Sequence, residues 1–274
     1  LEGGGQETGG RSGTEALSAI VGLAAAAGVA TRDLPQRIER LSALRDRLRD
    51  DVCLVQHGPF QGMKYAKARA LEGMALMKVY GLYEQELFGV VDEIRPKGYL
   101  SIVNIGAADG FYSVGLARLF PEALVTSFEM VDVEREACAA LAEHNGVADR
   151  MKLLGTATLD ALKTLFQNIA EPCFVLCDCE GAEVELLSLQ EIPRLASCDL
   201  LVELHDFSHS GTTIMESFGA RFAATHDARF INLRPDKFLG HLPDVGLSTA
   251  ERIYVGCEWR HHSVGCVFLQ SRNR

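Results

Sequence analysis

Glycines and polar residues in this chain come directly after apolar runs, which is how a parallel sheet builds a ligand site. The most informative stretch, residues 103–110, reads VNIGAADG. A glycine-rich turn between a strand and a helix lets the backbone approach a ligand closely, and the helix N-terminus favours negative charge. Its glycines do not follow the GxGxxG spacing of dinucleotide-binding proteins. The stretch therefore predicts a nucleoside-type cofactor site of a different kind.

Acids follow three later apolar runs. Glu129 ends the next run, where a carboxylate can accept both hydrogen bonds of a ribose diol, in a dinucleotide or a nucleoside cofactor alike. Residues 178–183 read DCEGAE, and residues 203–206 read ELHD. Because ligands of open α/β sheets bind over the carboxyl ends of the strands, these stretches predict one common site.

Three side chains of this predicted site can accept a proton from a hydroxyl group, namely Asp178, His205 and Asp206. His205 is the preferred general base, since the unperturbed histidine pKa lies near neutrality, and Asp178 is expected to position cofactor or substrate. We assign no metal ligand.

The elements that must position these residues alternate along the chain from residue 98 onward. Strand-length apolar runs occupy residues 100–105, 124–129, 151–154, 173–178 and 200–205. Helical patterns occupy residues 112–120, 134–144, 159–169 and 182–189. Such alternation predicts a parallel sheet covered by helices on both faces. Two more strands are expected at 221–225 and 264–270, with a helix at 249–259 between them.

Residues 99–206 resemble the class I S-adenosylmethionine (SAM)-dependent methyltransferases, and among them the FkbM-type family. The resemblance rests on VNIGAADGFY at 103–112, on FE at 128–129, on LD at 159–160 and on DCEGAE at 178–183. The last stretch is close to the family's signature DxEGAE. Asn104 stands where the family usually has an acid, and Ala108 stands where a glycine is common.

The resemblance implies methyl transfer from SAM, with S-adenosylhomocysteine (SAH) as the product. The expected reaction is O-methylation, by direct displacement, of a hydroxyl on a small-molecule, sugar or lipid-type acceptor. The expected fold is Rossmann-like, α/β, with a seven-stranded, mostly parallel sheet in the order 3-2-1-4-5-7-6, of which only the seventh strand is antiparallel. The expected cofactor-binding residues are Asn104, Gly106, Ala108, Asp109, Gly110, Glu129 and Asp178. The resemblance also makes Mg²⁺ a lesser candidate, since some class I O-methyltransferases hold it with acids at the ends of the fourth and fifth strands. Here Asp178, Glu203 and Asp206 would supply the oxygen ligands.

The chain is expected to have three parts. Residues 1–13 are predicted to be a disordered tail, residues 14–97 a mostly helical N-terminal extension, and residues 98–274 the SAM-binding domain. Within the extension we expect a helix at 34–49, a short strand at 52–55 and a helical stretch at 66–94 that breaks near Gly81.

Composition limits the partners and the compartment. The formal net charge of -10, with no basic run, argues against nucleic acid and anionic membranes and favours a small-molecule substrate. The apolar run at 19–30 is too short for a span of about 20 residues. The 8 cysteines are interpreted as reduced, mostly buried side chains rather than a zinc cluster, and a cytoplasmic location is expected. The sequence does not indicate an oligomeric state.

Two other functions remain open from the residues alone. One is an NAD-dependent Rossmann oxidoreductase, which the missing GxGxxG spacing disfavours. The other is a non-catalytic module with the SAM-binding fold that binds a protein partner through its N-terminal helices. Asn104 and Ala108 keep that second alternative open.

Overall fold

The computed structural model describes residues 52–66, 74–205, 214–234 and 265–273, all within one unit, Asp50–Arg274. The predicted tail, the helix at 34–49, the apolar run at 19–30 and the helix at 249–259 lie outside the described residues. Within them, no helix is long and apolar enough to cross a bilayer.

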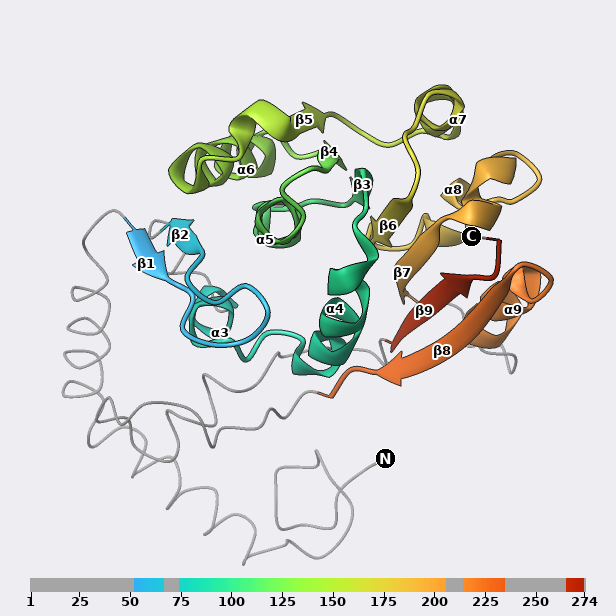
Figure 1. Ribbon diagram of the computed structural model, residues 1–274, viewed down its shortest axis with the longest axis horizontal. Coiled ribbons are helices and arrows are strands. Elements are labelled where there is room, and N and C mark those ends of the chain that lie inside the picture. The colour runs from blue at the N-terminus through green and yellow to red at the C-terminus, as the bar shows by residue number, and fades with distance from the viewer. Residues whose placement is uncertain (1–51, 67–73, 206–213, 235–264, 274) are drawn as a thin grey trace, which may run out of the picture. The chain divides into compact units, whose positions relative to one another are not determined.

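The central sheet has seven strands in the order β5-β4-β3-β6-β7-β9-β8, so that β5 and β8 form the edges of the described sheet (Figure 1). Numbered within this sheet, the order is 3-2-1-4-5-7-6, and only β9 runs antiparallel to its neighbours. Fold class and strand order are thereby confirmed. The strands are β3 (Ser101–Ile105), β4 (Leu124–Phe128), β5 (Met151–Leu154), β6 (Cys173–Cys177), β7 (Asp199–Leu204), β8 (His226–Asn232) and β9 (Gly265–Ser271).

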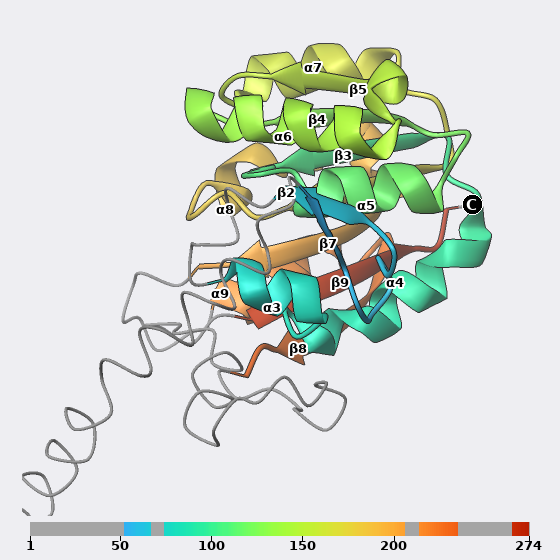
Figure 2. The same ribbon diagram turned by 90° about the vertical axis from the view of Figure 1, so that its left-hand side faces the viewer.

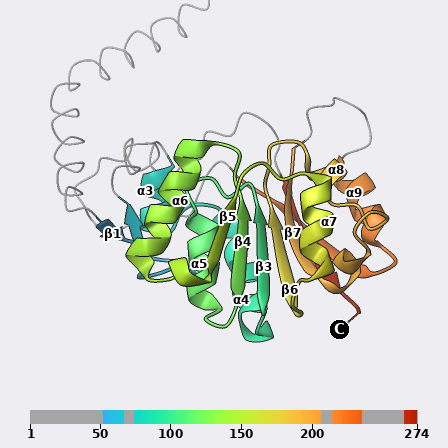
Figure 3. The same ribbon diagram turned by 90° about the horizontal axis from the view of Figure 1, so that it is seen from above.

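Helices cover both faces of this sheet, as the alternating pattern predicts (Figure 3). One face carries α4 (Phe88–Ile94), α5 (Phe111–Leu119) and α6 (Asp132–Asn145). The other face carries α7 (Leu159–Gln167), α8 (Glu183–Leu186) and α9 (Ile214–Phe222). Short 3-10 helices are η2 (Gln85–Leu87), η3 (Arg95–Lys97), η4 (Ala148–Arg150) and η5 (Pro193–Ser197). Because both faces are covered, β3 and β6 are buried along their whole length.

A small antiparallel hairpin precedes the sheet. It pairs β1 (Val52–Leu54) with β2 (Lys64–Ala66), and Figure 1 and Figure 2 show it next to α5 and α6. The Asn145 side chain at the end of α6 accepts from the Lys64 N–H (2.9 Å) and donates to the Lys64 carbonyl (2.7 Å). These two bonds fix the hairpin to the helix that follows β4.

The predicted helical stretch at 66–94 is divided into α3 (Ala75–Tyr80), η2 and α4, whereas Ala66 belongs to β2. The predicted break at Gly81 is confirmed. Gly81 has a left-handed φ of 66°, and a Cβ there would lie 2.3 Å from the carbonyl oxygen of His57. Glycine is therefore required to turn the chain after α3.

The strand predicted at 221–225 is wrong. Helix α9 continues to Phe222, and the strand begins only at His226. Phe218 and Phe222 are both fully buried, one helical turn apart, so this apolar signal belongs to a helix face. The true strand, β8, is mostly exposed and reads HDARFIN, so it lacks the apolar pattern of the inner strands.

Seven of the 8 cysteines fall in the described residues, and all seven are free thiols. The hydrogen bond to Cys179 and then burial hold the pKa of the Cys177 thiol well above its usual range. Their Sγ atoms are 3.7 Å apart, well beyond the length of a disulfide bond. These contacts fit the interpretation of the strand cysteines as small apolar side chains.

Candidate functional site

The glycine-rich turn after β3 is packed directly against the loop after β6. Gly106 has a φ of 84°, and a Cβ on it would lie 1.6 Å from the backbone oxygen of Asp178. Glycine is therefore required here, because the side chain of any other residue at position 106 would first separate the two backbones. Ala108 adopts a φ of 44°, a left-handed conformation that the glycine common at this position would enter without strain.

Asn104 presents an unsatisfied acceptor at this turn. Its Nδ2 donates to the Ser113 hydroxyl (2.8 Å), which also accepts from Ser127 (2.9 Å). Its Oδ1 is buried and has no hydrogen-bond partner among the described residues. Because a buried polar atom without a partner costs free energy, this acceptor fits a ligand with an N–H donor, such as an ammonium group.

Asp109 is held by three neighbours. Its carboxylate accepts hydrogen bonds from the Tyr65 hydroxyl, from the Phe111 N–H (3.2 Å), and at both oxygens from Lys78 Nζ (3.0 Å each). Burial would raise the pKa of Asp109, but the Lys78 charge and these hydrogen bonds lower it below its usual value. The bond to Phe111 also satisfies an N–H group of the first turn of α5.

Glu129, at the end of β4, supports the turn from the other side. Its carboxylate accepts from the N–H of Ala108 and from that of Val131, at 2.8 Å each. The side chain is partly exposed, and each carboxylate oxygen can accept more than one hydrogen bond. Glu129 can therefore hold the turn and still bind a diol.

His205 follows β7 and is surrounded by four carboxylates. Its Nδ1 lies 3.1 Å from Glu183, and its Nε2 lies 3.4 Å from Glu180, 3.8 Å from Glu203 and 3.9 Å from Asp178. Burial alone would lower the His205 pKa, but the hydrogen bond to Glu183 and the charges of Glu180 and Glu203 raise it above its usual value. Because Glu183 accepts at Nδ1, the second ring nitrogen faces the other acids.

Glu183 links this histidine to the loop after β6. Its side chain is fully buried, and Oε1 accepts from the N–H groups of Cys179 (3.2 Å) and Gly181 (3.0 Å) as well as from His205. Burial would raise the Glu183 pKa, but the His205 hydrogen bond and the backbone donors lower it. One carboxylate thus fixes both the imidazole and the loop that carries Asp178.

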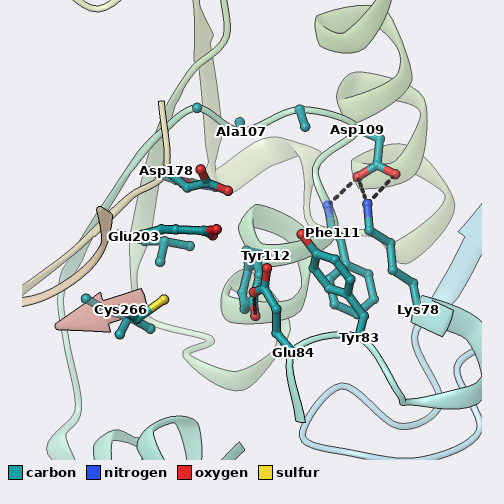
Figure 4. A pocket seen from close by; sticks show the side chains of 15 residues that line it. Lys78, Tyr83, Glu84, Ala107, Asp109, Phe111, Tyr112, Asp178, Glu203 and Cys266 are labelled. Atoms are coloured by element: carbon teal, nitrogen blue, oxygen red, sulfur yellow. Dashed lines mark hydrogen bonds and ion pairs between the residues drawn. The ribbon is translucent and has the colours of Figure 1, made fainter. Parts of the chain in front are cut away.

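These stretches enclose a pocket of about 460 Å³, counted with its space open to solvent (Figure 4). Four carboxylates line it, from Glu84, Asp109, Asp178 and Glu203. The Tyr112 hydroxyl donates to Glu84 (2.5 Å), and burial followed by the Glu84 charge holds the Tyr112 pKa well above its usual range. At the opposite side lies the Lys78–Asp109 ion pair (Figure 4). The pocket is therefore acidic, with one cation at one end of its described wall.

The structure brings most of the predicted site residues together. Asn104, Gly106, Ala108, Asp109 and Asp178 line this one pocket. The other predicted residues stand beside it: Glu129 bonds to Ala108, His205 lies against Asp178 and Glu203, and Gly110 (φ 89°) packs on Cys138.

Lys78, Tyr83 and Glu84 also line the pocket and were not predicted. They come from the extension, and no spacing connects them with the strand ends of the sheet. A lysine that follows an apolar residue in a helix is an ordinary surface pattern.

A cation could be held by Asp178, Glu203 and His205, whose ligand atoms lie within 4.8 Å of one another. The Mg²⁺ ligands suggested by the sequence included Asp206 instead of His205, and Asp206 lies outside the described residues. An imidazole nitrogen in place of a third oxygen suits a transition-metal ion better than Mg²⁺.

No family model matches the chain, and no curated protein matches it. Similar solved structures include the O-methyltransferase TomG from Streptomyces achromogenes in complex with SAM, at 18% identity and a TM-score of 0.47, over 74% of this chain and 88% of that one. Another is the O-methyltransferase from Bacillus cereus with SAH, at 13% identity and a TM-score of 0.47, over 75% and 91%. A third is cofactor-bound Rv0187 from MTB, at 16% identity and a TM-score of 0.46, over 96% and 100%.

Proposed function

We propose that the chain is a SAM-dependent methyltransferase that methylates a hydroxyl group of a small-molecule, sugar or lipid-type acceptor. The observation that carries the proposal is the polarity of the pocket. SAM has a sulfonium cation and an ammonium group. The carboxylates of Asp178 and Glu203, with the unsatisfied Oδ1 of Asn104, offer negative charge and an acceptor for such groups.

The same polarity disfavours the NAD alternative. In dinucleotide-binding folds the pyrophosphate sits at the N-terminus of the helix after the first strand. Here the Asp109 carboxylate bonds to an N–H group at that helix end, and Glu129 bonds to Ala108 in the turn. A pyrophosphate would have to displace one carboxylate and approach another, which like-charge repulsion opposes.

When bound, SAM supplies a methyl group activated by the sulfonium. In the proposed site, Glu129 binds the ribose diol, and Asn104 Oδ1 accepts from the ammonium. Asp178 positions the reacting groups, and His205 Nε2 accepts the proton of the acceptor hydroxyl. Glu183 keeps that nitrogen directed toward Asp178 by holding Nδ1.

An FkbM-type assignment is the finer part of this proposal. It is supported by the contacts within the DCEGAE stretch. Glu183, its last residue, binds both the loop backbone and His205, so the stretch acts as one structural unit. Gly181 has a φ of 116°, which few other residues adopt, and this gives the glycine of the stretch a structural reason.

Isothermal titration of the full chain with SAM, SAH and NAD tests the proposal. We expect SAM and SAH to bind and NAD not to bind; NAD binding without SAM binding would assign the oxidoreductase alternative. A methyl-release assay over hydroxylated small molecules, sugars and lipids then tests turnover. SAM binding without turnover on that set would favour the non-catalytic module.

A further inference from the structure

Lys78, on α3, belongs to a chain of contacts that joins the hairpin to the pocket. The Tyr65 hydroxyl on β2 donates to Asp109, and both oxygens of Asp109 accept from Lys78 Nζ. The ammonium also lies 5.1 Å from the centre of the Tyr83 ring, 5.5 Å from that of Phe111 and 5.9 Å from that of Tyr65. This aromatic cage and the ion pair hold the lysine in one place.

The position of this lysine divides the pocket by charge. Among the described residues that line it, Lys78 carries the one positive charge, and the Lys78 side chain is 13% exposed. Two of its three N–H donors go to the two Asp109 oxygens, which leaves one donor for a ligand. The Asp109 carboxylate also accepts hydrogen bonds from the Tyr65 hydroxyl and from the Phe111 N–H at the start of α5. Because these donors offset part of its negative charge, the Lys78 end of the pocket can still accept an anion.

We infer that Lys78 binds the carboxylate of the cofactor's amino-acid tail, and that Asp109 and Tyr65 are positioning residues for Lys78. The inference rests on the proposed function. The zwitterionic tail has to place its carboxylate away from Glu84, Asp178 and Glu203 and its ammonium near an acceptor. The Lys78 end of the pocket and Asn104 Oδ1 meet these two requirements. The hairpin is then part of the cofactor site rather than an appendage.

The test compares two ligands that differ in the tail alone. SAH carries the amino-acid tail, whereas 5′-methylthioadenosine lacks it. Lys78→Met keeps an unbranched apolar side chain and removes the charge. We expect the SAH dissociation constant of this variant to rise roughly 10- to 100-fold, as for a lost hydrogen bond to a charged group. The dissociation constant for 5′-methylthioadenosine should stay within about 2-fold, as for an independent site.

Three more variants complete the design. Lys78→Arg keeps the charge and should restore most of the SAH affinity. Tyr65→Phe removes the hydroxyl that holds Asp109, and we expect it to weaken SAH by roughly 2- to 10-fold without weakening 5′-methylthioadenosine. Lys152→Met, on the exposed side of β5, is the matched control and should change neither affinity. Thermal unfolding of each variant checks that it folds. If Lys78→Met does not fold, the SAH affinity of Tyr65→Phe provides the test.

The outcomes separate this inference from the proposed function. A parent chain that binds neither SAH nor 5′-methylthioadenosine would reject the proposed function itself. A parent that binds both, with equal losses in Lys78→Met, would show that Lys78 acts on the fold rather than on the tail. Unchanged SAH affinity in the folded Lys78→Met and Tyr65→Phe variants would also overturn the inference.

Discussion

Two clusters of ionisable side chains flank the same pocket and differ in their charge balance. The first, which we call the Asp109 cluster, consists of Tyr65, Lys78, Asp109 and the N–H of Phe111. The second, the His205 cluster, consists of Asp178, Glu180, Glu183, Glu203 and His205. One carboxylate meets one ammonium in the first, whereas four carboxylates meet one imidazole in the second.

This difference indicates different tasks. In the Asp109 cluster each charge is matched and hydrogen-bonded, which favours a fixed geometry. In the His205 cluster the acids outnumber the imidazole and raise its pKa, so the cluster suits the binding of a cation and the movement of a proton. Removal of a member should therefore affect mainly stability and binding in the first cluster, and mainly turnover in the second.

The largest effect is expected for His205→Ala. Loss of a general base lowers kcat by roughly 10²- to 10⁴-fold, while SAM affinity should stay nearly unchanged. Steady-state kinetics and titration with SAM measure the two quantities. If His205→Ala keeps full activity and Asp178→Asn does not, the carboxylate is the base or a metal ligand. Activity that is lost in EDTA and restored by Mg²⁺ would then assign the metal.

The next largest effect is expected for Asp109→Ala. It leaves the Lys78 ammonium largely buried without its acid, and breaking such a pair costs about 3 kcal/mol of unfolding free energy. Asp132→Ala is the matched control, because Asp132 pairs with Arg135 at the surface, and such pairs contribute about 1 kcal/mol at most. Urea unfolding measures both variants. Equal losses would contradict the structural task given to the Asp109 cluster.

A smaller effect is expected for Glu129→Ala, at a residue that belongs to neither cluster. Loss of its hydrogen bonds to the ribose should weaken SAM binding by roughly 1.5–3 kcal/mol. Its bonds to Ala108 and Val131 predict a minor loss of stability as well. Titration with SAM measures the affinity of this variant, and circular dichroism checks that it folds. Unchanged affinity in the folded variant would remove Glu129 from the site.

The smallest effects concern how the rate and the stability depend on pH. The stability contributions have opposite signs in the two clusters, whereas the rate depends on His205. The raised His205 pKa predicts a rate that rises with pH through a midpoint above the usual histidine value, because the base must be neutral. Glu183→Gln removes one cause of the shift and should lower that midpoint. A pH–rate profile of both proteins tests this, and an identical midpoint would exclude Glu183 as its cause.

For stability, the sign follows from the direction of each shift. The raised His205 pKa contributes stability that is fully present below the unfolded pKa and is lost as the pH rises through the folded pKa. The lowered Asp109 pKa contributes stability that is present above its unfolded value and is lost as the pH falls through the folded one. Unfolding midpoints of His205→Ala and Asp109→Asn across pH separate the two contributions.

The sequence was sufficient for the parts that depend on local pattern. Apolar runs located β3 to β7 and β9, and the strand ends indicated Asp178 and His205 as neighbours. It was insufficient for β8, because a mostly exposed strand without apolar alternation gives no periodic signal. The break at Gly81 was visible because glycine punctuates a helical pattern.

The contacts that define the two clusters could not be predicted in this way. Lys78 meets Asp109 across 31 positions of sequence, and His205 meets Glu183 across 22. Such pairs depend on how whole elements pack, and neither residue type nor spacing indicates the partner. The resemblance suggested Asp109 as a cofactor ligand, which stays a prediction, and no spacing in the sequence indicated that its carboxylate also accepts from Lys78.

The two edge strands of the described sheet also affect how copies of this chain can meet. An exposed strand edge can pair with a strand of another molecule and so lead to aggregation. Strand β5 is only 4 residues long and presents Lys152 to solvent, and β8 presents Asp227 and Arg229, which pair with Arg272 and Glu93. Short length and side-chain charge both discourage strand addition. We therefore expect any self-association to use helices or loops rather than a sheet that continues from one copy into the next.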